Sequence, residues 1–164
     1  MRILITYASR RGGTEGIAQI LGESLRDERY EVEVLPPGDV NDLDRYDAVV
    51  VGGALYAHRW HRAARRFVKR HVADLRKRST YFFSSGPLDD TASAGDIPPV
   101  ASVAALMSLV GARGHVTFGG RLRQDAKGFP ARAMAKTYSG DWRDPEQVRT
   151  WGRFIAADLV GGTK

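Results

Sequence analysis

The sequence contains no cysteine among its 164 residues. The absence of thiols excludes a disulfide framework, a thiolate-bound zinc or iron–sulfur site, and a cysteine nucleophile. It also fits a reducing compartment. Any metal site in this chain would need ligands from histidine, aspartate or glutamate.

Long apolar runs are absent as well. The longest mainly apolar stretches, Ala48–Ala57 and Val103–Ala112, have ten residues each and contain glycine, whereas a membrane-spanning helix needs about 20 apolar residues. At the N-terminus, Met1–Ile5 leads directly into a strand-like pattern without the small-residue cleavage site of a signal peptide. We therefore expect a cytoplasmic protein without a transmembrane segment.

Acidic residues are scarce in one part of the chain. The whole sequence has 25 Lys and Arg against 19 Asp and Glu, which gives a formal net charge of +6. Between Arg59 and Arg78 there are nine basic residues and one acid, Asp74, so this segment carries +8 and the remainder carries −2. The positive charge is therefore concentrated on about one helix of surface, where it would attract an acidic partner or ligand.

Strand and helix patterns alternate along the chain. Apolar runs predict five strands, at Arg2–Ala8, Glu31–Leu35, Asp47–Gly53, Ser79–Ser84 and His115–Phe118. Helical spacing predicts helices at Thr14–Glu28, Arg59–Arg78 and Pro98–Leu109, and a last one that begins at Asp144. With 43% hydrophobic residues and no internal repeat, this order predicts a single doubly wound α/β domain over residues 1–164.

The loop after the first strand has the composition of an anion site. It reads Ser9-Arg10-Arg11-Gly12-Gly13-Thr14-Glu15. Two glycines let the backbone fold closely around an anion, the hydroxyls of Ser9 and Thr14 can donate hydrogen bonds, and the following helix supplies free N–H groups. The loop lacks the glycine spacing of a dinucleotide-binding turn and the lysine of a P-loop. The alternative is a capped turn in which Ser9 or Thr14 satisfies the helix N–H groups.

Two motifs resemble a known family. The pattern Ser9-x-Arg11-Gly12-x-Thr14 after a first strand resembles the phosphate loop of flavodoxins. The run Gly52–His61, the later Phe67-Val68-Lys69-x-His71 and the pair Asp141-Trp142 resemble the flavodoxin-like branch that contains menaquinone-dependent protoporphyrinogen dehydrogenase. The resemblance covers nearly the whole chain. It implies a flavodoxin-like α/β fold, a doubly wound five-stranded parallel sheet of order 2-1-3-4-5 with helices on both faces.

The resemblance also implies a cofactor, non-covalently bound FMN. Its phosphate would lie in the first loop, and its isoalloxazine ring would lie between the loops after the third and fourth strands. Tyr56 is the favoured aromatic contact for the ring, whereas Trp60 is almost as well explained as a core residue of its helix. Backbone N–H groups near Ser85-Gly86 would bind the pyrimidine edge. The implied cofactor-binding residues are Ser9, Arg10, Arg11, Gly12, Gly13, Thr14, Ala54, Leu55, Tyr56, Ala57, His58, Trp60, Ser84, Ser85, Gly86, Pro87 and Leu88.

The chemistry of such a protein resides in the flavin, so no catalytic side chain is predicted. His58 and His61 have a spacing that places two imidazoles on one helical face, but a metal site needs further ligands, and we predict none. His58 lies where it would exchange a proton with a flavin or cap a helix. His71 is most simply a hydrogen-bonded core residue.

The segment from Arg121 to Asp144 is shorter than the corresponding insertion of the protoporphyrinogen enzymes. Basic and aromatic residues alternate in it, which suits either a lid over an anionic substrate or a solvated loop. Expected partners are a redox protein, a quinone or an anionic small molecule.

Two other functions compete with this prediction. The basic segment 59–78 would suit a nucleic-acid- or partner-binding module, but the sequence has none of the usual base-reading motifs. A flavodoxin-like fold that has lost its cofactor is the other alternative, and the hydroxyls at Ser9 and Thr14 argue against it.

Overall fold

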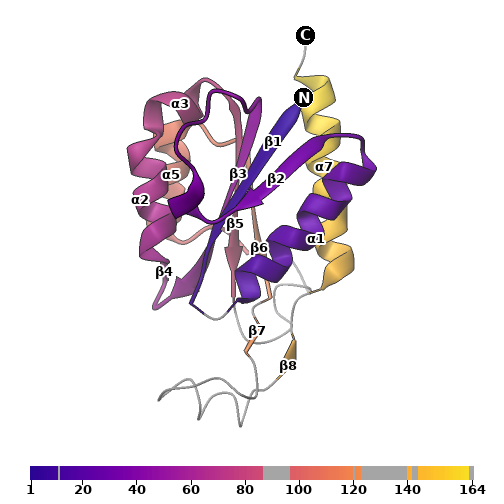
Figure 1. Cartoon of the computed structure of the whole chain (residues 1–164). Helices are drawn as coiled ribbons and strands as arrows, with labels where there is room; N and C mark the ends of the chain where they lie inside the picture. Colours follow the sequence, from indigo (N-terminus) through magenta and orange to yellow (C-terminus); the bar gives the residue numbers. More distant parts are fainter. Residues whose placement is uncertain (11, 87–96, 120, 123–139, 142–143, 163–164) are drawn as a thin grey trace.

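A central sheet with helices on both faces forms the body of the molecule (Figure 1). The computed structural model describes residues 1–10, 12–86, 97–119, 121–122, 140–141 and 144–162. The strands are β1 (Arg2–Ala8), β2 (Glu31–Leu35), β3 (Ala48–Tyr56), β4 (Arg59–Trp60), β5 (Ser79–Ser85), β6 (Gly114–Phe118), β7 (Arg121–Leu122) and β8 (Gly140–Asp141). The helices are α1 (Gly13–Asp27), the 3-10 turn η1 (Pro37–Asp39), α2 (Arg62–Arg70), α3 (Val72–Arg76), α5 (Ala101–Val110) and α7 (Pro145–Gly161).

The five predicted strands form a parallel sheet in the order β2-β1-β3-β5-β6. Counted as parallel strands in chain order, this is the expected arrangement 2-1-3-4-5. The sheet also has a sixth strand that the sequence did not predict, since β4 pairs antiparallel with the end of β3. β7 and β8 pair with each other in a separate two-stranded sheet.

Each face of the sheet has its own apolar core. On one face α1 and α7 pack together over β1, β3 and β5, with Ile17, Leu21 and Ile155 fully buried. On the other face α2, α3 and α5 cover the sheet, with Phe67, Leu75 and Val103 in the core. β3 is buried over most of its length, because a central parallel strand is covered on both sides.

Several predicted boundaries are confirmed. β1 and β2 have the predicted bounds, and β2 is an edge strand. Gly111 ends α5 in the left-handed region at φ 69°. Asp144 caps α7 by accepting hydrogen bonds from the N–H groups of Glu146 and Gln147, at 3.0 and 3.3 Å.

The prediction of one helix over 59–78 was wrong. The segment contains β4, then α2, and after a break at His71 the short helix α3. At its start, the Trp60 ring lies against Gly53, where a Cβ atom would be 2.8 Å from the indole. This packing fixes Trp60 beside the end of β3, so residues 59–60 pair with β3 before helix α2 begins.

Among the helices that the structure describes, none is both long and apolar enough to cross a lipid bilayer.

Candidate functional site

The loop after β1 lies at the carboxyl end of the sheet, where β1 passes into α1. Gly12 adopts a left-handed conformation at φ 80°, which glycine adopts without steric cost. Its N–H donates to Ser9 Oγ at 3.1 Å. Because the Ser9 oxygen acts as acceptor in that bond, its hydroxyl hydrogen can still be donated to a ligand.

The start of α1 has no side-chain cap. Ser9 binds the N–H of Gly12 and not the N–H groups of the first helical turn, so the capped-turn alternative is wrong for the residues described. Thr14 is fully buried, and its Oγ1 has no hydrogen-bond partner. A buried hydroxyl without a partner costs about 1–3 kcal/mol. An anion at this helix start would accept from that hydroxyl and from the first N–H groups of α1.

Tyr56, at the end of β3, connects the second predicted loop to the first. Its hydroxyl accepts a hydrogen bond from the Arg10 N–H at 2.9 Å. The guanidinium of Arg10 lies 5.1 Å from the centre of the Tyr56 ring, within the range of a cation–π contact. The favoured aromatic residue of the predicted ring site therefore lies against the phosphate loop.

A tight two-residue turn joins β3 to β4. Its residues, Ala57 and His58, have φ angles of 49° and 62°, as in the primed turns that connect hairpin strands. Such turns favour glycine and asparagine, because other residues at positive φ are strained. The sequence has no Asn-Gly signal here, so this turn was not foreseen. Both side chains are exposed at its tip.

Trp60 and Ser84 belong to a buried polar chain. Trp60 is 1% exposed and packs on Phe82, with ring centres 4.8 Å apart. Its Nε1–H donates to Ser84 Oγ at 2.9 Å, and Ser84 Oγ lies 2.9 Å from His115 Nε2. This environment favours the core interpretation of Trp60 over contact with a ligand.

His115 was not singled out by the sequence. Burial lowers its pKa to about 4, so the imidazole is neutral near pH 7. Its Nδ1 atom is buried and has no hydrogen-bond partner. The only sequence signal was a histidine in an otherwise strand-like run, and its contact with Ser84 comes from the pairing of β5 with β6.

The loop after β5 is described only at its start. Ser85 is buried, and Gly86 has φ 137°. The Gly86 N–H donates to the carbonyl oxygen of Phe118 at 2.8 Å. This N–H is therefore occupied within the sheet, and binding of a flavin by other N–H groups near Ser85-Gly86 stays a prediction. Arg11, Pro87, Leu88 and most of the segment 121–144 lie outside the described residues.

Ala54 and Leu55 line the same end of β3. Ala54 is buried and its carbonyl oxygen accepts from the His61 N–H at 2.8 Å. Leu55 is half-buried and lies next to Gly86, 3.7 Å from the position of a Cβ atom there. The structure therefore brings the ends of β3 and β5 together, as predicted for two loops that share one ligand.

The other histidines have structural surroundings. His61 caps α2, since its Nδ1 accepts from the Ala63 N–H at 3.1 Å. Burial and then the positive charges of Arg10 and Arg65 lower the pKa of His61. His71 is buried against Phe67, but its Nε2 has no hydrogen-bond partner, so the predicted bond is not seen at that atom. In the part of the chain that the structure describes, no three His, Asp or Glu side chains gather as metal ligands do.

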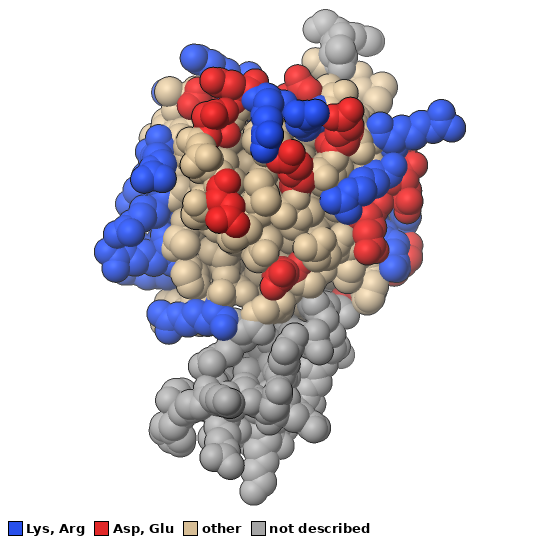
Figure 2. Space-filling model, in the orientation of Figure 1, with Lys and Arg blue, Asp and Glu red and all other residues tan. Residues whose placement is uncertain are grey.

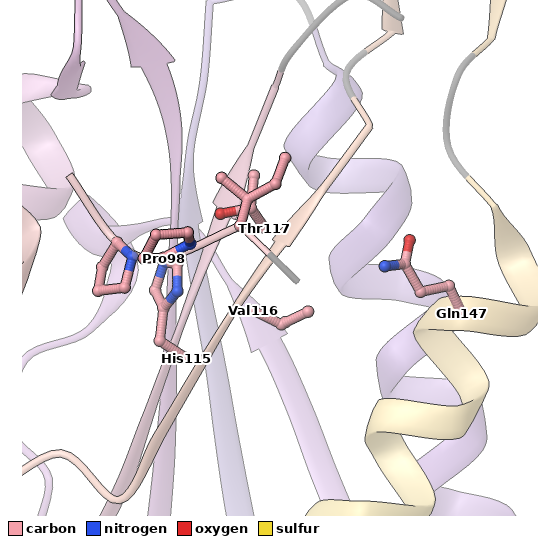
Figure 3. A pocket seen from close by; sticks show the side chains of 7 residues that line it. Pro98, His115, Val116, Thr117 and Gln147 are labelled. Atoms are coloured by element: carbon pink, nitrogen blue, oxygen red, sulfur yellow. The ribbon is translucent and has the colours of Figure 1, made fainter. Parts of the chain in front are cut away.

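A pocket of about 290 Å³ lies along the edge strand β6 (Figure 3). Pro98, His115 and Thr117 line it, and Gln147 enters from the first turn of α7. Figure 3 shows the His115 ring beside Pro98.

Taken together, the carboxyl ends of β1, β3 and β5 carry donors without acceptors and an aromatic side chain. The uncapped helix and the Thr14 hydroxyl suit a phosphate. At the ends of β3 and β5, Leu55 lies beside Gly86 and Tyr56 lies against Arg10. This arrangement suits a phosphorylated ring system better than a metal ion or a nucleophilic reaction.

Comparison with known proteins agrees with this assignment of the fold. The family model described as "Flavodoxin domain" matches residues 4–145. Protoporphyrinogen IX dehydrogenase [quinone] of Escherichia coli (strain K12) is 29% identical over 86 residues, which cover 51% of this chain and 48% of that protein. The match thus spans about half the length of the curated relatives.

Solved structures with the same fold include flavodoxins and a longer oxidoreductase. Oxidised flavodoxin 1 from Bacillus cereus superposes with a TM-score of 0.63 over 100% of both chains, at 17% identity. A Streptococcus pneumonia TIGR4 flavodoxin gives 0.64 over 96% of this chain and 99% of that chain, at 20% identity. Rubredoxin oxygen:oxidoreductase from Desulfovibrio gigas gives 0.66 over 98% of this chain and 36% of that chain, at 17% identity. With the family model matching most of its length, the chain belongs to the flavodoxin domain family.

Proposed function

We propose that this protein binds FMN non-covalently and acts as a flavin-dependent oxidoreductase or electron-transfer protein. The observation that carries the proposal is the start of α1, which has no side-chain cap and holds the buried, unpartnered Thr14 hydroxyl. Two independent features of one loop thus lack the partner that a phosphate would supply. Membership of the flavodoxin domain family supports the same ligand.

The protein's own part would be binding and orientation. Ser9, Thr14 and the first N–H groups of α1 would hold the phosphate. Leu55 and Tyr56 would support the ring, with Arg10 supplying positive charge beside it. When bound, the flavin itself would accept and release the electrons. The cytoplasmic location remains a prediction.

Titration of the flavin-free protein tests the cofactor. We expect FMN fluorescence to be quenched on binding and riboflavin, which lacks the phosphate, to bind at least tenfold more weakly. Equal affinities would contradict a phosphate site in the first loop. No binding of either compound would reject a flavin protein.

Oxidation of a porphyrinogen with a quinone as acceptor is the narrower candidate. It is favoured by the Escherichia coli relative that carries this name and by the basic surface, which would attract a carboxylated substrate. The test is to incubate the FMN-loaded protein with protoporphyrinogen IX and a menaquinone analogue and to follow porphyrin fluorescence. A rate equal to that of the flavin-only control would confine the proposal to electron transfer.

A further inference from the structure

The outer side of α2 carries positive charges that the rest of the protein does not balance. Four basic residues lie along it, and a fifth, Arg59, precedes it in β4. We call the exposed set Arg59, Arg62, Arg66, Lys69 and Arg70 the basic ridge. Residues 62, 66, 69 and 70 share one side of a helix by their spacing. The opposite side of α2 is fixed in the core through Ala64, Phe67 and Val68.

No residue of the basic ridge forms an ion pair with any described residue. Several cations elsewhere are paired: Arg2 with Glu31, Arg45 with Glu33, Arg113 with Asp158, and Arg149 and Arg153 with Glu146. Figure 2 shows this difference, with blue side chains along the edge that α2 occupies in Figure 1 and mixed red and blue across the front. The surface in front, where charges of both signs are paired, would attract a charged partner less strongly than the basic ridge.

The ridge charge at the start of α2, unlike those of Lys69 and Arg70 in its last turn, opposes the stability of the helix. The first turn of α2 contains no acidic residue and begins with Arg62. Positive charge at a helix N-terminus adds to the positive end of the helix dipole, and like charges four residues apart repel. Departures from local preference of this kind are typical of functional surfaces.

The ridge lies beside the candidate flavin site. It begins at β4, directly after the turn that follows Tyr56. Arg10, in the phosphate loop, and Arg65, in α2, both act on His61, whose pKa they lower together with burial. Arg65 is held in place by donating from Nε to the Trp60 carbonyl oxygen at 3.1 Å. Positive charge therefore continues from the phosphate loop onto α2.

We propose that the basic ridge docks an acidic protein that exchanges electrons with the flavin. The charges extend along a helix of nine residues, about 14 Å long, so they match a protein surface better than a small anion. Among the residues that the structure describes, the large exposed hydrophobic ones are Met1, Leu109, Phe154 and Val160. None of them lies on α2, so the ridge offers no apolar anchor for a membrane. The redox role of the partner rests on the proposed function, whereas the docking itself does not.

A reduced acidic [2Fe–2S] ferredoxin of plant type is a suitable probe. One electron would pass from its cluster to the bound FMN, which oxidises the ferredoxin and reduces the flavin by one electron. Stopped-flow absorbance would give the rate at about 20 mM and about 500 mM salt. We expect the rate to fall with salt, because screening weakens attraction between exposed charges.

Two double variants with the same loss of charge test the location. Arg62→Gln/Arg66→Gln removes two ridge charges, and Arg149→Gln/Arg153→Gln removes two paired charges from α7. We expect the first variant to slow the reaction about tenfold at low salt and much less at high salt, and the second to change it less than twofold. Equal effects of the two variants, or a rate that does not depend on salt, would overturn the proposal.

Equilibrium measurements separate the docking from the cofactor. FMN affinity is measured for each variant, and calorimetry follows binding of the flavin-free protein to oxidised ferredoxin. Ferredoxin binding that the ridge variant weakens supports docking even if FMN does not bind, in which case only the proposed function fails. Tight binding to duplex DNA or to vesicles with anionic lipid, lost in the ridge variant while ferredoxin binding is unchanged, would overturn the proposal in favour of those partners.

Discussion

Two fully buried threonines at opposite ends of the central sheet differ in whether their hydroxyls have hydrogen-bond partners. At the amino end, Thr80 Oγ1 donates to the Leu75 carbonyl oxygen at 2.9 Å, and Arg78 donates to the carbonyl oxygens of Tyr46 and Asp74 at 2.9 and 2.7 Å. At the carboxyl end, the equally buried Thr14 hydroxyl, which follows β1, has no partner.

The difference separates a surface built for stability from one that suits a ligand. Buried polar groups are almost always hydrogen-bonded in folded proteins, so those without partners call for an explanation. The same contrast holds between two helix starts at the carboxyl end, since Asp144 caps α7 and no side chain caps α1. α5 also starts there without a side-chain cap, so the start of α1 is distinguished by the buried, unpartnered Thr14 hydroxyl in its first turn.

The largest expected effect concerns His115 and pH. The unfolded chain takes up a proton at this residue near pH 6.5, whereas the folded protein does so only near pH 4. Between these values the unfolded state binds more protons, so stability falls as the pH is lowered through this window. The free energy of unfolding of the wild type should fall by roughly 3 kcal/mol at pH 4 because of this residue, and we expect His115→Gln to abolish that decrease.

Urea unfolding at a series of pH values from 7 to 4 measures this effect. His58→Gln is the matched control, since His58 is exposed at the turn between β3 and β4, and it should keep the wild-type dependence. If His115→Gln lost stability on acidification as steeply as the wild type, a buried neutral imidazole would be the wrong description of this position.

The next effect compares two fully buried threonines. Thr14→Val removes an unpartnered hydroxyl, so the flavin-free protein should become more stable by about 1 kcal/mol. The same change should weaken FMN about tenfold or more, because a hydrogen bond to a charged group contributes about 1.5–3 kcal/mol. Thermal unfolding and fluorescence titration give the two values.

Thr80→Val is the control at the amino end. It removes a hydroxyl that donates to Leu75, so stability should fall by about 1 kcal/mol and FMN affinity should not change. The same Thr→Val substitution should therefore raise the stability at residue 14 and lower it at residue 80. Unchanged FMN affinity in Thr14→Val would place the phosphate elsewhere.

The smallest effect concerns backbone strain at the carboxyl end. Ala57→Gly relieves a positive φ of 49°, and the gain is partly offset by the greater freedom of glycine in the unfolded chain. We expect a net stabilisation of about 0.5 kcal/mol. Ala63→Gly, in the helix α2, should instead destabilise by about 1 kcal/mol. A loss of stability in both variants would show that the turn is not strained.

Much of the fold was predictable, because periodic apolar residues and local signals determine it. The Asp144-Pro145 start of α7 appears in the sequence as the structure has it. The third strand was predicted at Asp47–Gly53, but β3 continues to Tyr56, through residues predicted as a loop. The division of residues 59–78 was not predictable, since it depends on the Trp60 ring packing against Gly53 and Phe82 on other strands. Sequence spacing describes a helix but contains no information on such distant contacts.

The sequence predicted which residues form the first loop of the candidate site, but not the hydrogen bonds that connect the site to distant residues. Glycines and hydroxyls identified the loop 9–15, because their chemistry is local. The hydrogen bond from Arg10 to Tyr56 joins residues 46 positions apart, and the contact of Ser84 with His115 joins residues 31 positions apart. Neither has a sequence signal, since both arise from the pairing of neighbouring strands.

The sequence by itself determined the alternation of strands and helices, the concentration of positive charge and the anion-binding composition of the first loop. These features depend on residues that are close in sequence, so the hydrophobic period, the charges and the glycine positions are sufficient to predict them. Tertiary structure alone decided which polar groups have partners. The same buried threonine hydroxyl is satisfied at residue 80 and unsatisfied at residue 14, because only the packed sheet determines which acceptors lie within reach.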